Sequence, residues 1–145
     1  MHESGRRRND LVLVIDDEST VLQALELLLG MWGYRVVTAG DEDEAVARLA
    51  ALGEAPRAIL ADYRLREGRT GLQAIARVRA LVGACLPGII ITGDGASAGL
   101  REARAAGMPV LQKPVPPLHL QAMLQHALRG RAAPDRPAAA AAASG

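Results

Sequence analysis

Short apolar runs recur along the chain, and most of them end in a polar side chain. Runs of this length with little alternation are typical of parallel strands that are buried on both faces. We therefore predict strands at residues 11–15, 35–39, 58–61, 88–91 and 110–112. The polar residues that directly follow four of these runs are Asp16 and Asp17, Asp62, Thr92, and Lys113.

Between the runs, apolar residues recur at the spacing of one helix face. The series 21, 25, 28 and 29 predicts a first helix with Ser19 or Thr20 as its N-cap. The helix predicted at 96–106 is rich in alanine and glycine, with Leu100 as its only large apolar residue, so we expect it to be the most weakly held. The remaining helices are predicted at 45–52, 72–82 and 116–130.

Strands and helices alternate throughout, which predicts an α/β fold with a parallel sheet, right-handed crossovers and helices on both faces. Five such units favour a (βα)5, flavodoxin-like, doubly wound parallel sheet with the strand order 2-1-3-4-5. In these sheets ligands bind outside the carboxyl ends of the strands, at the switch point between strands one and three. Those two strands lead into Asp16, Asp17 and Asp62, so the predicted fold and the polar residues indicate the same site.

Composition limits the kind of protein that this chain can be. A net charge of +1 over 145 residues offers no electrostatic argument for binding nucleic acid. A single cysteine excludes a disulfide framework and fits the reducing cytoplasm. No apolar stretch has the length of a membrane span. We expect a disordered leader at 1–9, the folded domain at 10–130, and a disordered Ala/Pro-rich tail or linker at 131–145.

Three carboxylates at one sheet edge require a compensating cation. Asp16, Asp17 and Asp62 suit Mg²⁺, a hard ion held by one or two carboxylates, water and a phosphate oxygen. A carboxylate beside such an ion can act as a nucleophile and form an aspartyl phosphate. Lys113 is the only lysine among 17 basic residues, and its compact ammonium suits a single phosphoryl oxygen. With the Thr92 hydroxyl as a further donor, these residues predict a phosphoryl-transfer site.

In order and spacing, these residues resemble the receiver domain of two-component response regulators over most of the chain. By this resemblance Asp62 is the phosphoacceptor, Asp16 and Asp17 hold Mg²⁺, Thr92 is the switch hydroxyl, and Lys113 binds the phosphoryl group. The resemblance implies a Mg²⁺-dependent module of a phosphorelay that takes a phosphoryl group from a phosphohistidine and changes conformation. Such a module assists its own phosphorylation and dephosphorylation but is a signalling protein, not an enzyme.

The resemblance also implies finer features of the site. The backbone carbonyl of Arg64 would be a further Mg²⁺ ligand. The Lys113–Pro114 peptide bond would be cis. Arg64 and Asp94 would flank the entrance to the phosphate site, where a pair between them would slow attack by water.

Two partners follow from the resemblance. A histidine kinase or a histidine phosphotransfer protein would dock on the first helix, where we expect either Val21 or Leu22 to face solvent. A homodimer would use the face formed by the fourth helix, the fifth strand and the last helix. Neither nucleic acid nor a membrane is an expected partner.

One position departs from the common pattern of the family. Receivers often carry Tyr or Phe three residues before the lysine, whereas this chain has Val110. Val110 and the Gln-Lys-Pro segment that follows it resemble receivers attached to hybrid histidine kinases, so a longer parent chain would be such a kinase. Two alternatives stay open: a receiver fold that acts as a phosphorylation-independent interaction scaffold, and an aspartyl-phosphate phosphatase. The phosphatase would carry Asp-x-Asp where this chain has Asp16, Asp17 and Glu18.

Overall fold

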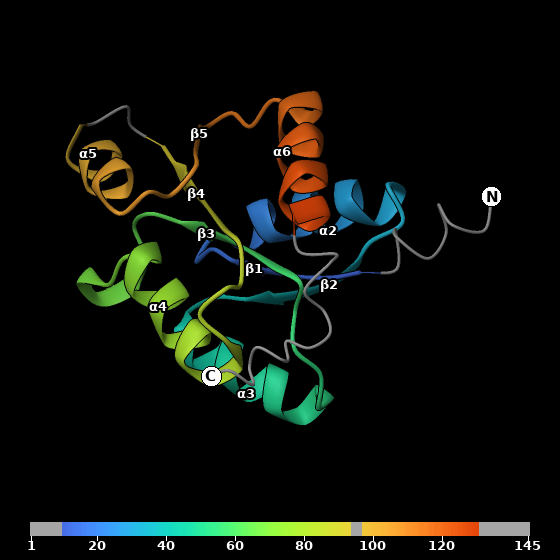
Figure 1. Ribbon diagram of the computed structural model, residues 1–145. Helices are drawn as coiled ribbons and strands as arrows, with labels where there is room; N and C mark the ends of the chain where they lie inside the picture. Colours follow the sequence, from blue (N-terminus) through green and yellow to red (C-terminus); the bar gives the residue numbers. More distant parts are fainter. Residues whose placement is uncertain (1–9, 94–96, 131–145) are drawn as a thin grey trace. The chain divides into compact units, whose positions relative to one another are not determined.

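The computed structural model describes residues 10–93 and 97–130, and it contains a five-stranded parallel sheet with the order β2-β1-β3-β4-β5 (Figure 1). The strands are β1 (Leu11–Ile15), β2 (Arg35–Ala39), β3 (Ala58–Asp62), β4 (Gly88–Thr92) and β5 (Val110–Gln112). Each predicted strand is present, and their order confirms the flavodoxin-like fold. Because neighbouring strands are parallel, their carboxyl ends lie at one edge of the sheet.

The chain divides between Val115 and Pro116 into two compact units. In the first unit α2 lies on one side of the sheet, and α3 and α4 lie on the other (Figure 1). The second unit contains α6, in which Leu120 and Leu124 are fully buried. The helices are α2 (Ser19–Met31), α3 (Glu42–Leu52), α4 (Gly71–Val82), α5 (Ser97–Ala105) and α6 (Pro117–Gly130), with a short 3-10 helix η1 (Arg66–Gly68).

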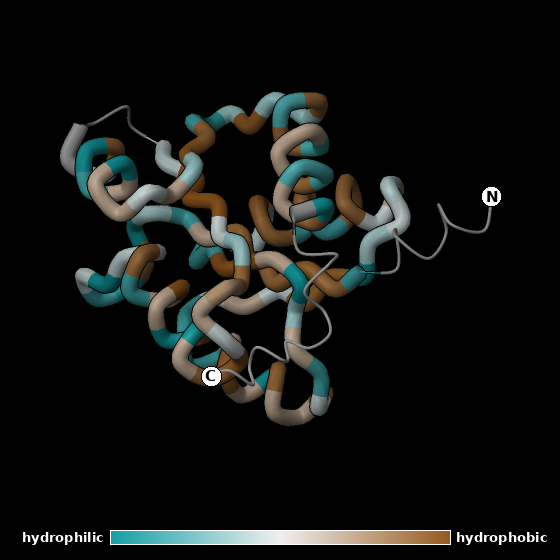
Figure 2. Tube along the Cα trace, viewed as in Figure 1, coloured by the Kyte–Doolittle hydropathy of each residue, from teal (hydrophilic) through white to brown (hydrophobic). Residues whose placement is uncertain are grey.

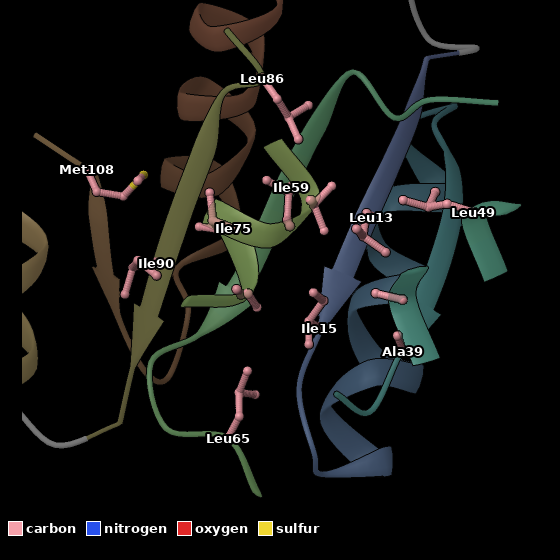
Figure 3. Packing of buried hydrophobic residues seen from close by; sticks show 14 of the residues in the cluster. Leu13, Ile15, Ala39, Leu49, Ile59, Leu65, Ile75, Leu86, Ile90 and Met108 are labelled. Atoms are coloured by element: carbon pink, nitrogen blue, oxygen red, sulfur yellow. The ribbon is translucent and has the colours of Figure 1, made fainter. Parts of the chain in front are cut away.

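The hydrophobic core is built on the three central strands. All residues of β1, β3 and β4 are buried, as expected for strands that are covered on both faces. Alternate residues point to opposite faces, and Leu13, Ile15, Ile59 and Ile90 pack with Ile75 of α4 (Figure 3). Hydrophobic residues follow the strands through the middle of the sheet, whereas the helices carry both hydrophobic and hydrophilic residues (Figure 2).

The first helix begins differently from the prediction. Its N-cap is Glu18, not Ser19 or Thr20, and Glu18 is extended without a side-chain cap. The Asp16 carboxylate accepts the backbone N–H of Glu18 at 2.9 Å, and the Glu18 carbonyl accepts from the N–H of Val21. Because Asp16 fixes the chain at Glu18, the helix already begins at Ser19.

Each helix within the described ranges is too short or too polar to cross a membrane. The leader and tail that we predict at residues 1–9 and 131–145 lie outside the described residues, and so does Asp94.

Candidate active site

The polar residues predicted at the strand ends meet at the carboxyl edge of the sheet. β1 pairs with β3, β3 with β4, and β4 with β5, so the residues that end these strands lie next to one another. Asp16 and Asp17 follow β1, and Asp62 ends β3. Thr92 ends β4, and Lys113 follows β5.

Three carboxylates form a compact cluster at this edge. Oxygen atoms of Asp16, Asp17 and Asp62 lie within 4.8 Å of one another. Asp16 is 2% exposed and Asp62 is 8% exposed, while Asp17 is the most accessible of the three. Burial and mutual repulsion disfavour three full negative charges here, and clustered carboxylate oxygens suit a hard divalent cation. The donor set therefore fits Mg²⁺.

The ammonium of Lys113 faces the same cluster. Its Nζ lies 3.3 Å from Oδ2 of Asp16 and 3.3 Å from Oδ1 of Asp62, with Oε1 of Glu18 at 3.6 Å. Burial opposes the charged form of the amine, but the charges of Asp62 and Asp16 outweigh burial and raise the pKa of Lys113. Lys113 is therefore a permanent positive charge inside an acidic site.

Burial also changes the acidity of the two inner carboxyls. Burial first, and the charge of Asp16 second, raise the pKa of Asp62 to about 6, although Lys113 acts in the opposite direction. Burial likewise raises the pKa of Asp16, against the hydrogen bond from Glu18 and the charge of Lys113. Strongly perturbed carboxyls beside a specific charge partner are typical of functional sites.

Thr92 and Lys113 are joined through the backbone. Thr92 is 4% exposed, and its carbonyl accepts the backbone N–H of Lys113 at 2.8 Å. This bond continues the pairing of β4 with β5 past the end of β5 and fixes the point where the lysine leaves the sheet. The Lys113–Pro114 peptide bond is cis, which confirms that prediction.

The loop after Asp62 is folded tightly against β3. An isolated β-bridge between Arg64 and Thr70 closes the loop. Position 71 requires glycine, because a Cβ on Gly71 would lie 2.4 Å from the carbonyl oxygen of Asp62. The first turn of α4 therefore lies directly against the backbone of Asp62. The role of the Arg64 carbonyl as a Mg²⁺ ligand stays a prediction, and the expected pairing of Arg64 with Asp94 lies outside the described residues.

A set of ion pairs that we did not predict ties this loop and α4 to the start of α3. Arg69 and Arg77 both contact Oε2 of Glu42, at 2.7 Å and 3.1 Å. Glu42 is 7% exposed, and within the described part of the chain its Oε1 has no hydrogen-bond partner. We call this set the arginine network; its further pairs are Arg77–Asp43 and Arg66–Asp41. The run of acids at 41–44 and the arginines after Asp62 are the sequence signals that could have indicated it.

Tyr63 is a further residue for which we predicted no catalytic role. It directly follows Asp62, and its half-buried ring packs against the hydrophobic core. Its hydroxyl donates a hydrogen bond to the Glu102 carboxylate on α5. This bond, together with burial, raises the pKa of Tyr63.

The exposed apolar residues of α2 differ from those that we predicted. Val21 and Leu22 are both half-buried, so the prediction that one of them faces solvent is wrong. Both lie one turn before the buried Leu25, and they therefore flank the core-facing stripe on its two sides. Leu27 is 71% exposed and Met31 is 77% exposed, and their spacing places them on one face of the helix.

The comparisons with known proteins agree with this geometry. The family model of the response regulator receiver domain matches residues 12–125. The transcriptional regulatory protein AruR of Pseudomonas aeruginosa is 40% identical over 87 residues, which make up 57% of this chain but only 34% of that relative. A receiver domain from Clostridium thermocellum has a TM-score of 0.74 at 26% identity, and the match covers 84% of this chain and 96% of that one. The chemotaxis protein CheY4 of Vibrio cholerae has a TM-score of 0.72 at 28% identity, with 83% and 99% covered.

Proposed function

Because this chain belongs to the response regulator receiver domain family, we propose that Asp62 accepts a phosphoryl group from a phosphohistidine and that the module then switches conformation. The observation that carries this proposal is the position of Lys113 Nζ, 3.3 Å from both Asp16 and Asp62. An ammonium that faces clustered carboxylates suits a transferred phosphoryl group, whose oxygens need positive charge and whose phosphorus needs a nucleophile. The module would act in the cytoplasm as one step of a two-component phosphorelay.

The transfer is a substitution at phosphorus. A carboxylate oxygen of Asp62 attacks the phosphorus atom, while the bond from phosphorus to the imidazole nitrogen breaks and its electron pair stays on the imidazole. The attack requires the ionised carboxylate, and a pKa of about 6 leaves Asp62 mostly ionised at neutral pH. Lys113 would hold one oxygen of the transferred group, and Thr92 would donate its hydroxyl to another.

Asp16, Asp17 and Asp62, with the backbone carbonyl of Arg64, would hold Mg²⁺. The ion, when bound, offsets the negative charge of the carboxylates and of the phosphoryl oxygens. Asp16 is oriented for this role beforehand, because its two oxygens already accept from the Glu18 N–H at 2.9 Å and from Lys113 at 3.3 Å.

The test of the acceptor is phosphorylation by acetyl phosphate with Mg²⁺, followed by measurement of the intact mass. We expect one added phosphoryl group, which hydroxylamine removes because the product is an acyl phosphate. Asp62→Asn should abolish the adduct, whereas Asp43→Asn, at an exposed aspartate on α3, should keep it. Equal labelling of the Asp62→Asn variant would overturn the assignment.

The test of the metal site uses thermal unfolding without a phosphodonor. Mg²⁺ should raise the Tm by binding only the folded chain, and Asp17→Asn should remove most of that rise. The variant should be at least as stable as the parent chain in EDTA, because one of three clustered charges is gone. A full response to Mg²⁺ in the variant would place the ion elsewhere.

The phosphodonor, a histidine kinase or a histidine phosphotransfer protein, would dock on α2. The exposed pair Leu27 and Met31 supports this surface, because exposed apolar side chains on one helix face are typical of interaction sites. Leu27→Glu should slow transfer from a phosphohistidine protein and leave transfer from acetyl phosphate unchanged. Slowing of both reactions would argue against docking at Leu27. The homodimer and the attachment to a hybrid histidine kinase stay predictions.

A further inference from the structure

Tyr63, which directly follows Asp62, contacts α5. Its backbone is held on both sides, since its N–H donates to the Ile91 carbonyl at 2.8 Å and its carbonyl accepts from the Gly71 N–H at 2.8 Å. The side chain of Tyr63 is half-buried. It packs against the hydrophobic core, and its hydroxyl donates to Glu102 on α5.

The tyrosine ring also lies against bare backbone of α5. A Cβ on Gly99 would come within 2.8 Å of the Tyr63 ring, so a larger residue would displace it. Gly99 and Glu102 are separated by one turn and share a helix face, so the phenol spans one turn of α5. Glycine at this position is what lets the ring approach so closely.

The described residues of α5 bury little apolar surface. Among the residues of α5 whose burial the structure describes, Gly99 and Ala103 are buried and Leu100 is half-buried. Small buried residues remove little apolar surface from water, so they stabilise the position of the helix only weakly. On β5, the neighbouring Val110 is half-buried and offers neither a ring nor a hydroxyl. The phenol of Tyr63 is therefore a major contact of α5.

We infer that Tyr63 transmits the phosphorylation state of Asp62 to α5. The inference rests on the proposed function, because it requires a phosphoryl group on Asp62. Phosphorylation adds roughly two negative charges beside the fixed backbone of Tyr63. Under the proposed function the Thr92 hydroxyl would donate to the new oxygens, and α5, which begins at Ser97, would move relative to the phenol. The contacts with Gly99 and Glu102 then differ between the two states, which is the differential interaction that a population shift requires.

The first measurement follows the ring itself. The chain has two tyrosines, so ¹³C-tyrosine labelling gives two sets of ring signals, and Tyr34→Phe identifies those of Tyr63. On addition of Mg²⁺ and beryllofluoride, a mimic of the phosphoryl group, the Tyr63 signals should shift and the Tyr34 signals should stay. Bound beryllofluoride is detected separately by ¹⁹F NMR.

The second measurement follows α5 by amide hydrogen exchange of residues 97–105. Tyr63→Phe keeps the ring but loses the hydroxyl, and it should speed exchange in the free protein about two- to tenfold, the factor expected for one hydrogen bond. Tyr63→Ala should speed exchange further and abolish the response of α5 to beryllofluoride. Glu102→Gln should act in the same direction as Tyr63→Phe, whereas Glu26→Gln, at an exposed glutamate on α2, should change nothing.

The outcomes distinguish a failure of the proposed function from a failure of the inferred role of Tyr63. If beryllofluoride does not bind the parent chain, the proposed function fails and the inference fails with it. If beryllofluoride binds but the Tyr63 signals stay in place, only the inference is overturned. It is also overturned if Tyr63→Phe and Glu102→Gln, which change no buried packing, leave α5 exchange and its response identical to the parent chain. Phosphorylation by acetyl phosphate should be the same in every Tyr63 variant that binds beryllofluoride, because the nucleophile is untouched.

Discussion

α4 and α5 follow neighbouring strands that end at the same site, but they are held in different ways. α4 begins with a capping box between Thr70 and Gln73, places Gly71 against the backbone of Asp62, and is linked to α3 by the arginine network. Its buried residues are Gly71, Ala74, Ile75 and Val78. α5 buries Gly99 and Ala103 among its described side chains and meets the loop after β3 through Tyr63.

The difference indicates that the two sides of the proposed acceptor, Asp62, have different roles. Local stability follows buried apolar contacts and satisfied hydrogen bonds, so α4 and its loop should open rarely and α5 more often. The proposed nucleophile and metal ligands would have to be held in a fixed geometry, and the α4 side of the site would supply this support. Under the proposed function, a response to phosphorylation requires a part that can move, and we expect α5 to move at a smaller cost than α4.

Gly71→Ala should have the largest effect on this comparison. Its Cβ would lie 2.4 Å from the Asp62 carbonyl oxygen, and that backbone cannot shift without disturbing β3. We expect a loss of about 3 kcal/mol in the free energy of unfolding, in the range of severe steric changes. Gly99→Ala is the matched variant, and it should cost less than Gly71→Ala, because its Cβ would meet a side chain instead of backbone and alanine favours a helix. If urea denaturation shows that both variants lose the same free energy of unfolding, α5 is held as firmly as α4.

Glu42→Gln should have the next largest effect. The buried Glu42 accepts from two arginines, and hydrogen bonds to charged groups are among the stronger ones, so we expect a loss of about 1–2 kcal/mol. Glu102→Gln changes an exposed carboxylate and should cost less than about 0.5 kcal/mol in global stability. Urea midpoints of the two variants measure this difference. If Glu102→Gln loses more free energy of unfolding than Glu42→Gln, then α5 is held more firmly than α4.

The last effect concerns pH and the proposed acceptor, Asp62. The folded protein raises the pKa of Asp62 to about 6, so it binds a proton more strongly than the unfolded chain does. The contribution of the Asp62 carboxyl to the free energy of unfolding is therefore fully present below its unfolded pKa. It is lost as the pH rises through about 6. Without Mg²⁺, Asp62→Asn should be more stable than the parent chain at neutral pH, and this gain should disappear toward pH 4.

The pKa of Asp43, which pairs with Arg77 of α4, is shifted in the opposite direction to that of Asp62. The hydrogen bond from Arg77 lowers the pKa of Asp43, so this carboxylate contributes stability above its unfolded pKa that is lost as the pH falls through its folded pKa. Asp43→Asn should therefore reduce stability slightly at neutral pH. Urea midpoints at several pH values test both variants. A gain for Asp62→Asn that does not depend on pH would contradict the buried, repelled carboxyl at this position.

The fold and the site were predictable from the sequence for the same reason. Parallel strands bring their carboxyl ends to one edge, so once the strands were placed, Asp16, Asp62 and Lys113 had to lie close together. The links from Arg77 to Glu42 and from Tyr63 to Glu102 join separate helices and loops. They depend on how those elements pack and on side-chain rotamers, which hydrophobic periodicity does not encode. The start of α2 was predicted at the wrong residue because the Asp16 carboxylate accepts the backbone N–H of Glu18. The sequence indicates Asp16 as a metal ligand and gives no sign of this hydrogen bond.

The single lysine has a consequence for how the chain can be chemically modified. All other side-chain cations are arginine or histidine, so Lys113 carries the only ε-amine. Acetylation or any other acylation of lysine in this chain would remove the charge that lies 3.3 Å from Asp16 and Asp62. The two carboxylates would then face each other without their counter-charge. Because the chain has one lysine, acylation of a lysine side chain in this protein would always modify the candidate phosphoryl-transfer site.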